Sequence, residues 1–184
     1  IGFCLVGSEM CIRDRVRILG NRNLQTAATR TRVADLMRRS GHWEEAAAQY
    51  GATVETYRQL LGDDDSRTID SRNLLGLTYR QWKRYEEAEP LLRTSLEDGL
   101  RVLGPDHIWV GRYYRRLARC YYEMGRFDDA LVPALAELEQ RRRTTPESSE
   151  TANALRMWGQ ILVGLGRLDE AEAYQQQGIA ERER

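Results

Sequence analysis

Apolar residues in this chain recur at the spacing of one face of an α-helix. Four segments carry such residues three or four positions apart, and these are Val33, Leu36 and Met37; Leu74, Leu75 and Tyr79; Leu117, Cys120 and Tyr121; and Leu155, Trp158, Ile161 and Leu162. This periodicity is typical of helices that bury one face. A turn signal and a second helical segment follow each of them. The pattern predicts an all-α chain built of antiparallel helix hairpins.

A short motif repeats four times along the chain. Each copy has a turn, a bulky residue, two acids and an alanine, as in Gly41-His42-Trp43-Glu44-Glu45-Ala46, Lys83-Arg84-Tyr85-Glu86-Glu87-Ala88, Gly125-Arg126-Phe127-Asp128-Asp129-Ala130 and Gly166-Arg167-Leu168-Asp169-Glu170-Ala171. The bulky residue stands at positions 43, 85, 127 and 168, at spacings of 42, 42 and 41. A fixed period of this length is typical of stacked supersecondary units.

Each part of the motif has a physical reason. Glycine tolerates the left-handed backbone that ends a helix, so Gly41, Gly125 and Gly166 are predicted to close the first helix of a hairpin. Lys83 breaks this pattern in the second copy. The acid pairs complement the dipole at the start of the second helix. The alanine lets the two helices approach closely.

The breakers between motif copies place the repeat boundaries. Leu61-Gly62-Asp63-Asp64, Leu103-Gly104-Pro105-Asp106 and Thr145-Pro146-Glu147 stand at equivalent places. The predicted helix pairs are 22–40 with 43–61, 67–82 with 85–103, 107–124 with 127–143, and 149–164 with 168–183. Four repeats, at about 22–61, 67–103, 107–143 and 149–183, are thus expected within one repeat domain of residues 16–184.

Residues 1–15 are set apart from these repeats. The run Leu5-Val6-Gly7-Ser8-Glu9-Met10-Cys11-Ile12-Arg13-Asp14 resembles the translation of an adapter used to prepare DNA sequencing libraries. On this resemblance, the segment is a non-native artefact or a disordered stretch to be left out of fold reasoning. The alternative is a short natural N-terminal segment.

The 42-residue unit resembles the kinesin light chain subclass of tetratricopeptide repeats. The resemblance is carried by Leu75-Gly76 and Tyr79, by Tyr85-Glu86-Glu87-Ala88-Glu89-Pro90-Leu91-Leu92 and by Val102-Leu103-Gly104-Pro105-Asp106-His107, and it covers residues 22–184. Trp43 and Leu168 replace the usual tyrosine in the outer repeats. The resemblance implies a right-handed superhelical solenoid of about four hairpins, whose first helices line a concave groove for a peptide or partner helix.

The resemblance to the family also implies which residues face the groove, from their position in the repeat. The set is Arg38, Arg39, Asp70, Asn73, Leu77, Arg80, Gln81, Arg112, Arg115, Arg119, Tyr122, Glu123, Asn153, Arg156 and Gln160, and the candidate binding residues among them are Asn73, Arg80, Arg112, Arg115, Arg119, Tyr122 and Arg156. Arginine pairs bidentately with carboxylates, so one hypothesis is a groove that prefers acidic peptides. The other is a solvated arginine face, because exposed helix positions favour arginine for its helix propensity alone.

Composition and charge narrow the classes of partner. Lys plus Arg equals Asp plus Glu at 28 each, so no global field draws the chain to nucleic acid or to a membrane surface. No apolar run approaches the roughly 18 residues of a membrane span. The three cysteines, Cys4, Cys11 and Cys120, suit neither a disulfide framework nor a zinc site, which favours a reducing, cytoplasmic setting.

The residue types that carry chemistry are sparse. His42 and His107 fall in turns without a catalytic partner, and Cys120 lies on an apolar face as a small core residue. The run Asp63-Asp64-Asp65 lacks the alternation of a calcium loop and is better explained as a helix cap. No catalytic residue, metal site or cofactor is expected.

These features favour a non-enzymatic scaffold that binds a protein or peptide. The alternative is a regulatory repeat array cut from a larger multidomain signalling enzyme, such as a kinase or a nucleotide-binding switch. Self-association through an uncovered terminal repeat is a further expectation.

Overall fold

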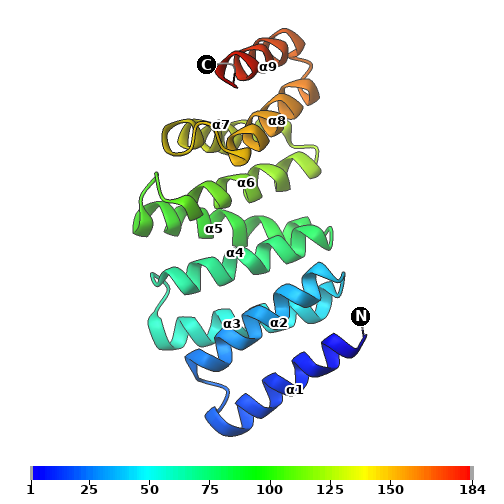
Figure 1. The fold of residues 1–184 in the computed structure, drawn as a ribbon, viewed down its shortest axis with the longest axis vertical. Helices are drawn as coiled ribbons and strands as arrows, with labels where there is room; N and C mark the ends of the chain where they lie inside the picture. Colours follow the sequence, from blue (N-terminus) through cyan, green and yellow to red (C-terminus); the bar gives the residue numbers. More distant parts are fainter. Residues whose placement is uncertain (1, 183–184) are drawn as a thin grey trace. The chain divides into compact units, whose positions relative to one another are not determined.

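The computed structural model describes the backbone of residues 2–182 and the side chains of residue 10 and residues 12–176. Over residues 2–182 it contains nine helices and no strand (Figure 1). The helices are α1 (Gly2–Leu19), α2 (Leu24–Arg39), α3 (Trp43–Leu61), α4 (Ser66–Gln81), α5 (Tyr85–Leu103), α6 (Ile108–Glu123), α7 (Phe127–Thr144), α8 (Ser149–Gly164) and α9 (Leu168–Arg182). The predicted all-α fold is confirmed, and each of the eight predicted helices begins and ends within two residues of α2 to α9.

The chain divides into two compact units. The N-terminal unit runs from Ile1 to Asp98 and the C-terminal unit from Gly99 to Arg184, so the division falls within α5. In the N-terminal unit α1 packs on α2, α2 on α3 and α3 on α4. In the C-terminal unit α6 packs on α7, α7 on α8 and α8 on α9, and α6 also touches α8. Each unit is thus a stack of consecutive helices, as the repeats predict.

The turn inside each hairpin has one conformation in all four repeats. Gly41, Lys83, Gly125 and Gly166 have φ of 84°, 63°, 74° and 74°, in the left-handed region. The next residue donates its backbone N–H back across the turn, to Met37, Tyr79, Tyr121 and Leu162 respectively, at 2.9 Å in each case. These bonds satisfy carbonyl groups that the end of a helix leaves without partners. The predicted helix-ending role of the three glycines is confirmed, and Lys83 takes it too.

The residue that precedes the first helix of each repeat plays the same part in all four repeats. Asn23, Asp65, His107 and Ser148 precede α2, α4, α6 and α8, and each accepts a hydrogen bond from a backbone N–H of the following turn. Asp65 is therefore the helix cap that the sequence predicts for its acidic run. Its pKa lies below the usual range because the Arg67 side chain donates to the carboxylate. His107 accepts from Trp109 through Nδ1 at 3.2 Å.

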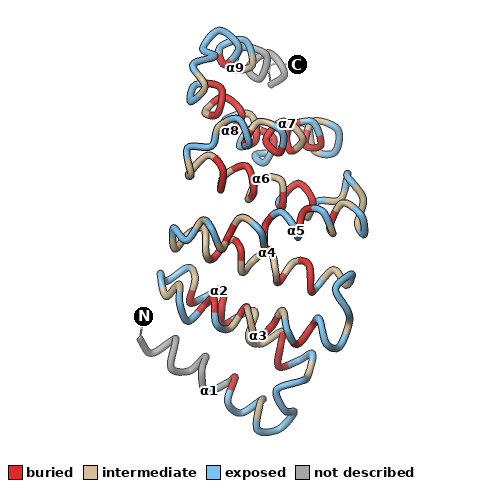
Figure 2. Tube along the Cα trace, turned by 180° about the vertical axis from the view of Figure 1, so that it is seen from behind, coloured by how far each residue is buried: buried red, intermediate tan, exposed pale blue. Residues whose placement is uncertain are grey.

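Small residues fill the contacts between the helices of a hairpin. Ala46, Ala88, Ala130 and Ala171 are buried, as the motif predicts. A second series on the first helices, Ala34, Gly76, Ala118 and Gly159, is buried at the same 42, 42 and 41 spacing, and sequence analysis did not identify it. A Cβ on Gly76 would lie 2.9 Å from the Leu92 side chain, so α4 and α5 are in close contact. Figure 2 shows buried and exposed stretches alternating along the described helices.

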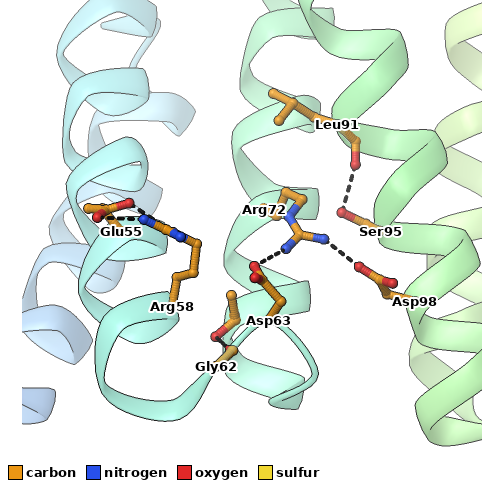
Figure 3. A network of polar contacts seen from close by, with 9 residues as sticks. Glu55, Arg58, Gly62, Asp63, Arg72, Leu91, Ser95 and Asp98 are labelled. Carbon is orange, nitrogen blue, oxygen red and sulfur yellow. Dashed lines mark hydrogen bonds and ion pairs between the residues drawn. The ribbon is translucent and has the colours of Figure 1, made fainter.

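Arg72 ties three segments of the N-terminal unit together. From α4 its guanidinium donates to Asp98 on α5 at 2.6 Å and to Asp63 in the preceding connection at 3.0 Å (Figure 3). The Arg72 side chain is 12% exposed, so both bonds are partly shielded from water. The exposed fraction of Asp63 is much larger, at 58%, and its bond is the weaker of the two for that reason.

The segment that sequence analysis set apart is helical. Residues 2–19 form α1, which ends at Gly20 with φ of 80°, as α3 and α5 end at Gly62 and Gly104. Ile12 is buried against Val33 and Met37 of α2. Sequence analysis did not predict this helix because the segment has neither a capping residue at its start nor a clear apolar period. The resemblance of residues 5–14 to an adapter concerns their origin, which stays a prediction.

Candidate functional site

Five of the seven candidate residues lie on two neighbouring helices of the C-terminal unit. Arg112, Arg115, Arg119 and Tyr122 follow each other at three- and four-residue spacing along α6, which places them on one stripe of that helix. Arg156 stands on α8, 41 residues after Arg115 and at the same place in the repeat. We call these five residues the α6–α8 face. α6 and α8 touch each other, so the face spans two repeats within one unit.

Arg112 and Arg156 are the accessible cations of this face. Both side chains are exposed, and neither makes a hydrogen bond or ion pair within the described part of the chain. Their guanidinium groups are therefore available to a ligand. A carboxylate could take two parallel N–H donors from either one.

Arg115 has a structural role. Its Nε donates to Oε1 of Glu137 on α7 at 2.6 Å, and its Nη2 donates to the backbone oxygen of Glu150 on α8 at 3.2 Å. The Glu137 carboxyl is fully buried, and burial raises its pKa while the charge of Arg115 opposes the rise. Arg115 thus links three helices, and it compensates a buried acid that would otherwise be costly.

Arg119 and Tyr122 are held by their neighbours. Arg119 pairs with Glu123 one turn later at 2.7 Å, and its guanidinium carbon lies 5.7 Å from the centre of the Tyr122 ring. The Tyr122 ring meets Phe127 edge to face at 5.6 Å between ring centres. The pair offers a partly neutralised cation beside an aromatic surface.

The two candidate residues of the N-terminal unit are less accessible. Asn73 is fully buried, so its side chain offers no surface to a partner. Arg80 is half-buried. On α2, Asp35 pairs with Arg38 at 2.5 Å and with Arg39 at 2.8 Å, and Arg38 also donates to Gln81 on α4 at 2.9 Å. Arg38 and Arg39 of α2 are therefore largely neutralised by Asp35.

A buried polar cluster lies between α6 and α7, and sequence analysis did not find it. Glu137, Gln140 and Arg141 on α7 are each 2% exposed or less. Gly111 on α6 makes room for them, because a Cβ there would lie 2.2 Å from Gln140 Oε1 and 2.9 Å from Arg141 Nη2. Burial lowers the pKa of Arg141. The helical pattern gave no signal for this cluster, since these polar residues occupy a face that is otherwise apolar.

The cysteine and histidine that could take part in chemistry have structural roles. Cys120 is a buried free thiol, and His107 serves as a helix cap. Among the described side chains, no three His, Cys, Asp or Glu residues are placed to hold a metal ion. In the same part of the chain, no helix has the length and apolar character to cross a membrane.

Comparison with protein families gives matches along most of the chain. A tetratricopeptide repeat model matches residues 25–99 and 83–133, and a second tetratricopeptide repeat model matches residues 151–184. A comparison with curated protein sequences found no match.

Solved structures with the same fold are similar over nearly the whole chain. BtubC (BKLC) from P. vanneervenii has a TM-score of 0.85 and 20% identity, with 97% of this chain and 73% of that chain covered. A kinesin light chain from Podosopora anserina with nearly identical TPR-like repeats has a TM-score of 0.84 and 17% identity, with 97% and 85% covered. Aspartyl phosphate phosphatase F from Bacillus subtilis has a TM-score of 0.76 and 16% identity, with 87% and 41% covered. These likenesses confirm the kinesin light chain-like repeat fold.

Proposed function

Because the chain belongs to the tetratricopeptide repeat family, whose repeats commonly mediate contacts between proteins, we propose that it is a non-enzymatic scaffold for a protein or peptide partner. The proposed binding surface is the α6–α8 face of the C-terminal unit. The proposed partner segment is acidic.

One observation carries the proposal. Arg112 and Arg156 are exposed and pair with no acid among the residues whose side chains are described, whereas Arg38, Arg39, Arg115 and Arg119 each pair with a carboxylate. Unpaired exposed cations on two adjacent helices favour a segment that presents carboxylates. Tyr122 adds an aromatic surface of the kind that is enriched where binding energy concentrates.

The structure also decides which arginines should be changed in a test. Reversing the charge of Arg115 would leave Glu137 buried beside a second acid, so lost binding could come from lost folding. Arg112 and Arg156 avoid this problem because both are exposed and neither holds a buried acid among the described side chains. The informative variant is therefore Arg112→Glu/Arg156→Glu.

The test measures binding of three peptides of matched length, rich in glutamate, glutamine or lysine, by fluorescence anisotropy at two salt concentrations. We expect the glutamate peptide to bind most tightly, and salt to weaken that binding through screening. The Arg112→Glu/Arg156→Glu variant should bind it at least about tenfold more weakly, as expected when charge-assisted hydrogen bonds are lost.

The matched control is Arg32→Glu/Arg93→Glu. It makes the same change in net charge at two exposed arginines of the N-terminal unit that have no ion pair in the described structure. Equal weakening by both double variants would show that net charge alone governs binding. Equal binding of the glutamate and glutamine peptides would remove the acidic preference from the proposal.

A second candidate function rests on one comparison. The match with aspartyl phosphate phosphatase F spans 87% of this chain but only 41% of that chain. A stack of this kind can therefore form part of a longer protein. We propose as the alternative that the repeats regulate a multidomain signalling enzyme. The flanking sequence of the intact gene tests this, because a kinase or nucleotide-binding domain would show its phosphate-binding motifs.

A further inference from the structure

His107 closes the start of α6 with an imidazole nitrogen. Its Nδ1 accepts the backbone N–H of Trp109 at 3.2 Å, and its ring meets the Trp109 ring edge to face at 5.4 Å between ring centres. The first N–H groups of a helix have no partner within the helix, so this bond satisfies one of them. An imidazole nitrogen can accept such a bond only while it carries no proton.

The cap of α6 differs in its chemistry from the caps of the other first helices. Asn23, Asp65 and Ser148 make the equivalent bond at α2, α4 and α8 through an amide, a carboxylate and a hydroxyl oxygen. The amide and the hydroxyl do not change their charge in mild acid, and the pKa of Asp65 lies below its usual range. Histidine is the side chain whose charge ordinarily changes between about pH 5 and 8. Among these four caps, His107 alone belongs to that class.

A proton on His107 acts against α6 in two ways. It turns Nδ1 from an acceptor into a donor, which removes the bond from Trp109. It also places a positive charge at the start of a helix, where the helix dipole is itself positive. The ring is half-buried, so water reaches it. Both effects have the same sign: the neutral imidazole stabilises the start of α6, and this contribution is lost as the pH falls.

The charged groups around the cap do not cancel these effects. Asp106 precedes His107 in the chain and favours a charged imidazole, but it pairs with Arg143 of α7 at 2.8 Å. Arg141 of α7 lies against the first turn of α6, since a Cβ on Gly111 would be 2.9 Å from its Nη2. The first charged residue of α6 itself is also an arginine. The surroundings of the cap therefore carry more positive than negative charge, which opposes a proton on the ring.

We propose that His107 is a pH-sensitive cap, which holds the first turn of α6 at neutral pH and releases it in mild acid. The connection before α6 stays attached when the cap opens, because the buried Gln140 side chain of α7 donates to the backbone oxygen of His107 at 2.8 Å and does not titrate. Release is therefore confined to the first turn, residues 108–111. The switch requires no partner, so it stands apart from the proposed scaffold function.

The test follows backbone amide exchange of the full chain by NMR at about pH 7.5 and about pH 5, on either side of the ordinary histidine range. Rates are expressed relative to those of an unfolded chain at the same pH, which removes the direct effect of pH on exchange. We expect the protection of Trp109, Val110 and Gly111 to fall about fivefold at the lower pH, as for the loss of a typical helix cap. The starts of α2 and α8 should keep their protection.

Two variants of the cap separate this bond from other groups that take up protons. His107→Asn is the matched variant, because asparagine caps α2 in the first repeat and does not titrate. It should keep the protection of α6 at both pH values. His107→Ala has no acceptor, and at neutral pH it should show the low protection that the parent shows in acid. Both variants retain Glu137, the buried acid of α7 whose pKa is raised by burial.

Three results would overturn the proposal. The first is unchanged protection of the parent at the lower pH. The second is an equal loss in His107→Asn, which would assign the pH effect to Glu137 or to another group. The third is full protection of α6 in His107→Ala at neutral pH, because the bond to Nδ1 would then contribute nothing to the first turn.

Discussion

Lys83 has the backbone conformation of a glycine. Within residues 2–182 it is the one non-glycine residue with positive φ, and it takes the place held by Gly41, Gly125 and Gly166 in the other repeats. For a residue with a Cβ, the left-handed region costs about 1–2 kcal/mol. The hydrogen bonds of the turn are formed all the same, so the repeat imposes this conformation on Lys83.

We therefore expect Lys83→Gly to stabilise the protein. Relief of the left-handed strain exceeds the added flexibility of glycine in the unfolded chain, and the net gain should be about 0.5–1 kcal/mol. Urea unfolding followed by circular dichroism measures it. The reverse change, Gly125→Lys, should destabilise the protein by a similar amount. Lower stability of Lys83→Gly would show that the lysine side chain makes a compensating contact.

The arginines of the α6–α8 face differ in what they do. Arg112 and Arg156 are exposed and unpaired, whereas Arg115 holds a buried carboxylate. Position in the repeat predicted all three as groove residues, and it could not separate them, because Glu137 lies 22 residues away from Arg115 and only the fold brings the two together. The same limit applies to Asn73, whose burial depends on the helices around it.

At the scale of the helices, local signals were sufficient for most of the fold. The helices α2, α4, α6 and α8 begin after a residue whose side chain caps the helix, and α3, α5, α7 and α9 carry two acids in their first turn. A glycine or proline follows the end of most of them within two residues, and these short-range features set the predicted bounds. α1 lacks such a start, and its burial comes from Ile12 contacting α2, a contact that a pattern search does not reveal. The small series Ala34, Gly76, Ala118 and Gly159 was open to detection, since it follows the repeat period.

Close packing within a hairpin gives a prediction about Ala88. This residue is fully buried on α5, where a larger side chain has no free space. Ala88→Leu should lower the free energy of unfolding by about 1–3 kcal/mol through overpacking. The matched control is Ala48→Leu on α3, which adds the same atoms at an exposed helical position. Thermal and urea unfolding should separate the two variants, and equal stability of both would contradict the packing described for the repeats.

At the scale of the whole chain, a single repeat register organises the sequence. Turns, caps and small residues recur at 42, 42 and 41 residues from α2 to α9. Within each of the two units, consecutive helices pack on one another. Stability in such proteins is approximately a sum of repeat and interface terms. The regular positions therefore account for the fold, and we propose that some departures from the repeat serve binding. The exposed arginines on α6 and α8 and the buried charges of α7 are such departures.

The central claim is that a partner binds on α6 and α8. Its most direct test is hydrogen exchange, read by mass spectrometry, with and without the glutamate-rich peptide that binds most tightly. The account predicts slower exchange in segments of α6 and α8, no change in α2, and loss of the protection in Arg112→Glu/Arg156→Glu. Protection confined to α7 and α9, or protection that survives in this variant, would contradict it.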